Sequence, residues 1–183
     1  GSEMCIIDSI DSGLIVDILN AKTMEDVFRL LQGCSFLGSF LAYQYTIDMN
    51  YSPYINFSEN DFVKAGIGAI RGIKKCFLCY GNKCEDAIWY VKEHFNDLQK
   101  RYGYTSFHPL LGHEPTLIDL QNCFCETDKY LRAKMPELRI GNVRIKQKYM
   151  PHTDPIQFFF PPKWNIVEMY KYKPIVVPTL FDL

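Results

Sequence analysis

The stretch CSFLGSFLAYQ (34–44) is the strongest indication of how this chain folds, because it sets one glycine, Gly38, between two apolar helical patterns. A short turn of this kind leaves backbone N–H groups unpaired at the start of the following helix, and such a helix N-terminus attracts a phosphate. Further along comes the acidic segment FSENDF (57–62). A carboxylate placed there, such as Asp61, is suited to face a base that has been lifted out of a duplex.

Turn, helix and acidic segment follow one another in the order of a helix-hairpin-helix module that binds DNA. The alternative is that Gly38 marks a plain connection between two amphipathic helices, which is the commoner use of such a glycine. The spacing leaves both interpretations open.

Apolar residues at helical spacing predict further helices on both sides of this stretch. They are expected over residues 9–19, 23–33, 36–49, 69–80, 82–102 and 115–136, with a short helical turn over 59–64 that Ser58 caps. The helix over 36–49 is apolar nearly all round and is therefore expected to be the central buried helix.

The predicted fold is all-α, a multi-helix bundle. Its expected core consists of Phe36, Leu37, Phe40, Leu41, Tyr43, Ile73, Phe77, Ile88, Val91, Phe95, Leu120 and Phe124. Beyond Pro136 the chain is rich in proline and aromatic residues (FFFPPKW, 158–164), and because proline removes backbone donors this tail is expected to lie extended across the helices. We therefore predict a helical domain over 3–150 and an extended tail over 151–183.

Composition and charge narrow the class of protein. With 183 residues, 48% of them hydrophobic, the chain can bury a substantial core. Its net charge of −1 argues against a strong non-specific nucleic-acid binder, so any phosphate-binding surface must be local. No apolar run suggests a membrane span or a secretory signal, and an intracellular protein is expected.

Two local clusters of cations are candidates for phosphate contact, although either one can equally be a solvated face. The smaller comprises Arg71, Lys74 and Lys75. The larger is a basic strip consisting of Arg132, Lys134, Arg139, Arg144, Lys146 and Lys148.

The cysteines raise the question of a metal. There are seven, and Cys76 and Cys79 have the spacing of paired thiolate ligands for zinc or an iron–sulfur cluster. The same two cysteines lie on the apolar face of a predicted helix, where cysteine commonly acts as a small buried hydrophobe. Since the four histidines are scattered, we expect no metal and no cofactor.

Five segments together carry a resemblance to a known family: CSFLGSFLAYQ (34–44), NFSENDF (56–62), GAIRGIKKCF (68–77), IDLQNCFCETDKYLR (118–132) and IKQKY (145–149). In this order they resemble the helical domain of 5-hydroxymethyluracil DNA kinases and of the related glutamyl/putrescinyl-thymine pyrophosphorylases. The resemblance runs from about Met24 to Trp164. It implies a fold similar to that of helix-hairpin-helix DNA glycosylases and a place in the hypermodification of thymine in DNA.

The resemblance also implies roles for individual residues. The hairpin would be Phe36, Leu37 and Gly38, held near a DNA phosphate, and Asp61 would be the acidic residue at the modified base, with a catalytic role if the domain is active. Cations that would bind DNA or substrate phosphate are Arg71, Lys74, Lys75, Lys129, Arg132, Arg144, Lys146 and Lys148, with Glu126, Asp128 and Tyr130 beside them. Two simpler interpretations stay open: Asp61 can help Ser58 to cap a turn, and Asp128 can form an intrahelical ion pair with Arg132.

One departure from a kinase bears on the chemistry. The segment GIGAIRGIKK (66–75) lacks the Gly-Lys-Ser/Thr ending of a phosphate-cradling loop, so this segment alone should not phosphorylate DNA. The leading hypothesis is a DNA-associated domain that recognises or modifies a 5-substituted pyrimidine. The alternative is a non-catalytic nuclear scaffold that has kept the fold and binds a protein partner through the basic strip or the aromatic tail.

Overall fold

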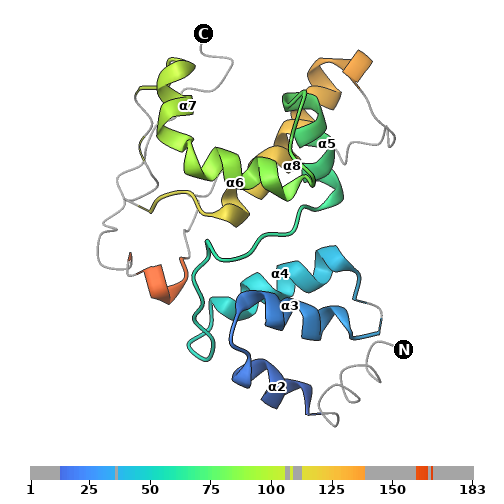
Figure 1. Cartoon of the computed structure of the whole chain (residues 1–183), viewed down its shortest axis with the longest axis vertical. Helices are drawn as coiled ribbons and strands as arrows, with labels where there is room; N and C mark the ends of the chain where they lie inside the picture. Colours follow the sequence, from blue (N-terminus) through green and yellow to red (C-terminus); the bar gives the residue numbers. More distant parts are fainter. Residues whose placement is uncertain are drawn as a thin grey trace, which may run out of the picture.

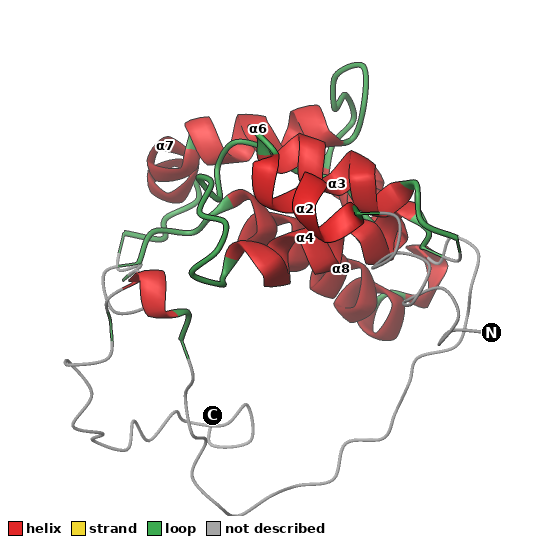
Figure 2. Ribbon diagram, turned by 90° about the horizontal axis from the view of Figure 1, so that it is seen from below, coloured by secondary structure: helices red, strands yellow, loops and turns green. Residues whose placement is uncertain are grey.

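The computed structural model describes residues 13–35, 37–105, 108, 113–138, 160–164 and 166. Their regular structure is entirely helical, with no strand among the described residues (Figure 2). The helices are α2 (Leu14–Asn20), α3 (Met24–Gln32), α4 (Ser39–Asn50), α5 (Ile67–Cys76), α6 (Glu85–Glu93), α7 (Phe95–Arg101) and α8 (Leu117–Lys134), and two short 3-10 turns are η1 (Pro136–Leu138) and η2 (Pro162–Trp164). The predicted all-α class is confirmed.

The helices form two groups joined by one long connection. Helices α2, α3 and α4 pack together, and α5 and α6 pack on α8. Figure 1 shows the first group below the second, with the connecting segment 51–66 running between them. Among the described helices, none is both long enough and apolar enough to cross a membrane.

Helix α3 begins after Thr23, the N-cap residue that the sequence predicts. The Thr23 hydroxyl accepts a hydrogen bond from the Asp26 N–H at 3.1 Å, and the Asp26 carboxylate accepts one from the Thr23 N–H at 2.9 Å. This reciprocal capping box satisfies two N–H groups that a helix start otherwise leaves unpaired. The predicted start at Thr23 is thereby confirmed.

Helix α4 is less buried than predicted. Its buried residues include Tyr43, which contacts the Phe62 ring edge-on, Ile47, and Asn50, which hydrogen-bonds Phe57. On its other face the side chains of Phe40 and Leu41 are 48% and 44% exposed. Their assignment to the core was wrong, because an apolar pattern all round a helix does not say which face finds a neighbour.

The rest of the predicted core is largely confirmed. Tyr43, Ile73, Ile88 and Leu120 are buried. Five others are half-buried and pack against this core, namely Leu37, Phe77, Val91, Phe95 and Phe124. Phe36 lies outside the described residues.

Helices α5 and α8 approach each other closely because glycines face the contact. A Cβ atom added to Gly72 would lie 2.0 Å from the backbone oxygen of Phe124, and one added to Gly68 would lie 2.4 Å from Cys125 Sγ. Only the absence of a side chain allows the two backbones to come so near.

The connecting segment 51–66 contains no helix, contrary to the helical turn predicted over 59–64. Its shape is set instead by Asn50, whose side-chain amide accepts a hydrogen bond from the Phe57 N–H at 2.8 Å and donates one to the Phe57 carbonyl at 3.1 Å. The segment then buries Ile55, Val63 and Ala65 between the two helix groups. Ser58 does cap a turn here, because its hydroxyl accepts a hydrogen bond from the Asn60 N–H at 3.1 Å, but this turn does not continue into a helix.

Glu85 attaches the end of the connecting segment to α6. Its carboxylate accepts a hydrogen bond from the Ala65 N–H at 3.1 Å and lies 2.8 Å from the Lys64 ammonium. Burial alone would raise the pKa of Glu85, but the hydrogen bonds from Lys64 and Ala65 bring this pKa below its ordinary value of 4.5.

We expect Glu85→Gln to lower the free energy of unfolding at neutral pH by about 1.5–3 kcal/mol, since it removes charged hydrogen bonds. Because the folded-state pKa is depressed, the contribution of the carboxylate is complete above the unfolded pKa near 4.5 and is lost as pH falls through the lower folded pKa. Urea denaturation of both proteins from pH 7 downwards measures this. A difference that stays constant at acidic pH would contradict the assignment.

Candidate functional site

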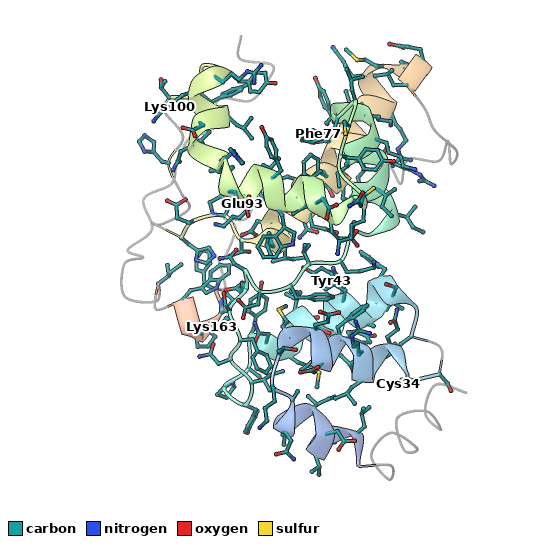
Figure 3. The ribbon with its side chains drawn as sticks, in the orientation of Figure 1. Cys34, Tyr43, Phe77, Glu93, Lys100 and Lys163 are labelled. Carbon is teal, nitrogen blue, oxygen red and sulfur yellow. The ribbon has the colours of Figure 1, made fainter. Side chains whose placement is uncertain are left out.

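Five side chains meet where the connecting segment, the start of α8 and the tail come together: Tyr51, Glu59, His113, Lys163 and Trp164, here called the Glu59 cluster. Lys163 and Trp164 belong to η2, which Figure 1 shows in orange-red beside the connecting segment. The side-chain view places Lys163 at this junction (Figure 3). Residues more than a hundred positions apart are therefore neighbours here.

The Glu59 carboxylate lies at the centre of the cluster and is 9% exposed. Its Oε2 atom accepts a hydrogen bond from the Trp164 indole N–H at 2.7 Å and lies 3.9 Å from the Lys163 ammonium. Its Oε1 atom is buried without a hydrogen-bond partner among the described residues. A buried carboxylate oxygen without a donor is costly.

Aromatic rings surround this carboxylate. The His113 ring stacks on Trp164 with centroids 3.7 Å apart and planes 22° apart. Tyr51 meets the same indole edge-on at 5.9 Å, and the Lys163 ammonium lies 5.5 Å from the Tyr51 ring centroid. The Trp164 indole thus contacts two aromatic rings, and its N–H group donates to the Glu59 carboxylate.

Burial in the Glu59 cluster shifts the pKa values of two side chains, Tyr51 and Lys163. Burial, and then the Glu59 charge, raises the pKa of the Tyr51 hydroxyl. Burial lowers the pKa of Lys163, and the Glu59 carboxylate opposes that change. Lys163 also donates a hydrogen bond to the Asn50 carbonyl at 2.9 Å, which attaches η2 to the end of α4.

The segment FSENDF (57–62) supplies this carboxylate, but not from the predicted position. Asp61 is exposed, and its backbone N–H donates a hydrogen bond to the Ser58 carbonyl at 3.2 Å, which forms a tight turn. Glu59, two residues earlier, is the buried acid. Spacing alone carried no signal that separates the two, because both flank the same turn.

The predicted hairpin is only partly described. Leu37 is half-buried, and Gly38 is the exposed N-cap residue of α4, with extended dihedrals of φ −70° and ψ 160°. Phe36 lies outside the described residues. The phosphate contact assigned to these residues stays a prediction.

Two of the predicted phosphate-binding cations are engaged inside the protein. Lys75 on α5 lies 2.7 Å from Asp128 on α8, and Arg132, one turn further along α8, lies 3.1 Å from the same carboxylate. The three side chains are 3%, 1% and 9% exposed in that order. The simpler interpretation of Asp128 and Arg132 as an intrahelical ion pair is confirmed.

The other predicted cations are more accessible or undescribed. Lys74 is exposed and Arg71 is half-buried on α5, while Lys129 is exposed on α8 beside Glu126. Arg144, Lys146 and Lys148 lie outside the described residues.

The glycine-rich segment GIGAIRGIKK (66–75) is almost wholly helix α5. Gly68 and Gly72 face α8, where they permit close helix packing. From Ile70 onward the backbone N–H groups are hydrogen-bonded inside the helix, so the segment does not form a separate glycine-rich loop around a phosphate.

Cys76 and Cys79 are both exposed, so the expectation that they are buried hydrophobes was wrong. Helix α5 ends at Cys76, and the next residue, Phe77, packs against the core. Among the described residues, no three His, Cys, Asp or Glu side chains are placed to hold a metal ion.

Comparison with known proteins gives one result. A family model described as "5-hmdU DNA kinase, helical domain" matches residues 3–140. No curated protein and no solved structure matches the chain.

Proposed function

The chain belongs to the family of the 5-hmdU DNA kinase helical domain, and from that membership we propose that it is a DNA-associated domain of the thymine-hypermodification type, which recognises a 5-substituted pyrimidine in DNA. The family description names DNA as the molecule on which its kinases act. Recognition of one base inside a duplex requires that the base be extruded and read by polar groups and aromatic rings.

The observation that carries the proposal is the helical state of residues 66–75. A domain of a DNA kinase that uses its glycines for helix packing is better suited to hold the DNA than to hold the phosphate donor. On this view the described part of the chain presents the substrate, and phosphoryl transfer requires a nucleotide-binding site elsewhere.

The accessible groups can be assigned roles within this proposal. Asp61, exposed on its turn, approaches the modified base, and the N-terminus of α4 at Gly38 approaches a phosphate. Lys74 and Lys129 contact the DNA backbone together with Lys146 and Lys148 of the basic strip, since cations of this kind position a protein on DNA without reading its sequence.

The test is binding of the purified chain to duplexes that contain either thymine or 5-hydroxymethyluracil, at two salt concentrations. We expect tighter binding to the modified duplex, a preference that Asp61→Asn abolishes without changing Tm because Asp61 is exposed. Lys146→Glu with Lys148→Glu should weaken binding to both duplexes and flatten the salt dependence. Absence of DNA binding at low salt would overturn the proposal.

Asp97→Asn provides the matched control for Asp61. Asp97 is an equally exposed carboxylate on α7, so its replacement makes the same change of net charge. The base preference should survive in this variant. Loss of the preference in both variants would show that net charge, and not the position of Asp61, controls it.

The engagement of Lys75 and Arg132 by Asp128 favours a second candidate function. Because Lys75 and Arg132 are paired with Asp128, these two cations do not contribute to a DNA-binding surface. The alternative is a nuclear scaffold that binds a protein partner. The fully exposed Leu78, just after α5, provides an apolar contact for such a partner. On this alternative, charge reversals at Lys146 and Lys148 would weaken association with a protein partner and leave DNA unaffected.

A further inference from the structure

We propose that Trp164 is a positioning residue for Asp61: its hydrogen bond to Glu59 fixes the turn 58–61 from the side of the tail, and so sets where the Asp61 carboxylate meets the modified base. The inference rests on the proposed function, in which Asp61 approaches that base. It adds that base recognition depends on a residue of the tail that does not itself contact the base.

The turn 58–61 is short and closes on itself. The Asp61 N–H donates a hydrogen bond to the Ser58 carbonyl at 3.2 Å, and the Ser58 hydroxyl accepts one from the Asn60 N–H at 3.1 Å. Within this turn the Glu59 side chain is buried and Asp61 is exposed. Because one residue separates the two acids, the position of Asp61 depends on how Glu59 is held.

The residue that follows Asp61 attaches the turn to the first helix group. The Phe62 ring lies 5.1 Å from the ring of Phe28 on α3 and 5.8 Å from that of Tyr43 on α4, measured between centroids. This contact fixes the C-terminal side of the turn.

The other attachment of the turn comes from the tail, through η2 (Figure 1). The Trp164 indole N–H donates to Glu59 Oε2 at 2.7 Å. The neighbouring Lys163 ammonium lies 3.9 Å from the same carboxylate, and it donates to the Asn50 carbonyl at 2.9 Å and to the Phe57 carbonyl at 3.5 Å. The tail thus holds the chain just before Asp61, as Phe62 holds it just after.

Loss of the indole N–H should move the turn. The Glu59 carboxylate would lose a short hydrogen bond, and a buried charge that loses a donor is driven towards solvent. The turn would keep its attachment at Phe62 and lose the one at Glu59. Since a hydrogen bond weakens steeply with poor distance and angle, a displaced Asp61 would no longer read the base.

The experiment measures binding of the full chain to labelled duplexes that contain thymine or 5-hydroxymethyluracil, by fluorescence anisotropy. Trp164→Phe keeps an aromatic ring but removes the N–H donor. It should abolish the preference for the modified duplex by weakening that binding about tenfold, the lower end of what a hydrogen bond to a charged group contributes. Binding to the thymine duplex should not change, because phosphate contacts do not read the base.

A double-mutant cycle separates positioning from a general structural role. In the Asp61→Asn background the preference is already absent, so adding Trp164→Phe should leave the affinity for both duplexes unchanged. Any fall in Tm caused by Trp164→Phe should be equal in the two backgrounds, because Asp61 is exposed. The same loss of affinity in both backgrounds would overturn the inference.

Trp89→Phe is the matched control, since it makes the same exchange at the other tryptophan, a half-buried residue of α6. It should keep the base preference. If Trp164→Phe fails to fold by circular dichroism, two variants of Glu59 decide. Glu59→Gln keeps an acceptor for the indole N–H and should keep the preference, whereas Glu59→Ala removes the acceptor and should lose it. Equal preferences in these two variants would overturn the inference.

The outcomes also separate this inference from the proposed function. If the wild-type chain does not prefer the modified duplex, both are wrong. If it has the preference and Asp61→Asn abolishes it, but Trp164→Phe retains it, the inference alone is wrong.

Discussion

Replacing Asp128 with alanine should lower the free energy of unfolding by about 3–5 kcal/mol, the cost of leaving buried charges without their counter-ion. The Asp128 side chain is 1% exposed and lies within ion-pair distance of both Lys75 and Arg132. Its removal leaves two cations close together on the contact between α5 and α8. Urea denaturation at neutral pH measures the loss.

Glu126→Ala is the control for this prediction. Glu126 is on the same helix and pairs with Lys129, but both side chains are at least half exposed. An exposed pair contributes about 0–1 kcal/mol, so this variant should be nearly as stable as the wild type. Equal losses in the two variants would show that burial does not decide the strength of these pairs.

Gly72→Ala should be destabilising by about 3 kcal/mol, at the upper end of the usual cost of overpacking. Its new methyl group would lie 2.0 Å from the backbone oxygen of Phe124 and 2.8 Å from the carbonyl carbon. Since a backbone atom cannot rotate aside, α5 and α8 must move apart. Thermal unfolding followed by circular dichroism measures the effect.

Gly38→Ala separates this clash from the general effect of replacing glycine. A Cβ atom at Gly38 meets nothing within 4 Å, and its φ of −70° suits any residue. We expect a loss of no more than about 1 kcal/mol, because glycine is preferred to alanine at a helix N-cap. If Gly72→Ala were as mild, the close approach of the two helices would be in error.

The sequence was most informative where one residue's chemistry fixes a local structure. The capping pattern at Thr23 placed the start of α3 correctly, and the apolar stripe that includes Ile88 indicated a helix there. Periodicity could not say that this stripe is interrupted at His94, where α6 ends and α7 begins. It also could not say which face of α4 would remain in solvent, because that depends on where the other helices pack.

The candidate site was harder to predict, because its residues meet only in the folded chain. The acidic segment 57–62 was singled out, yet the choice between Asp61 and Glu59 depends on the direction of one turn. The tail sequence FFFPPKW suggested packing but gave no indication that Trp164 donates to Glu59. Likewise, nothing in the spacing of Lys75 and Asp128 indicates that they pair across two helices.

The side chain of Asn50 carries a consequence for how this chain can vary. Its amide offers Phe57 one donor and one acceptor, as a backbone peptide group of a neighbouring strand would. The ring closed by these two bonds has a fixed number of residues, whereas the bonds at Phe57 do not depend on its side chain. Amino-acid exchanges at the exposed residues Pro53, Tyr54 and Asn56 should therefore be tolerated more readily than insertions or deletions, so this part of the segment is constrained in length more than in composition.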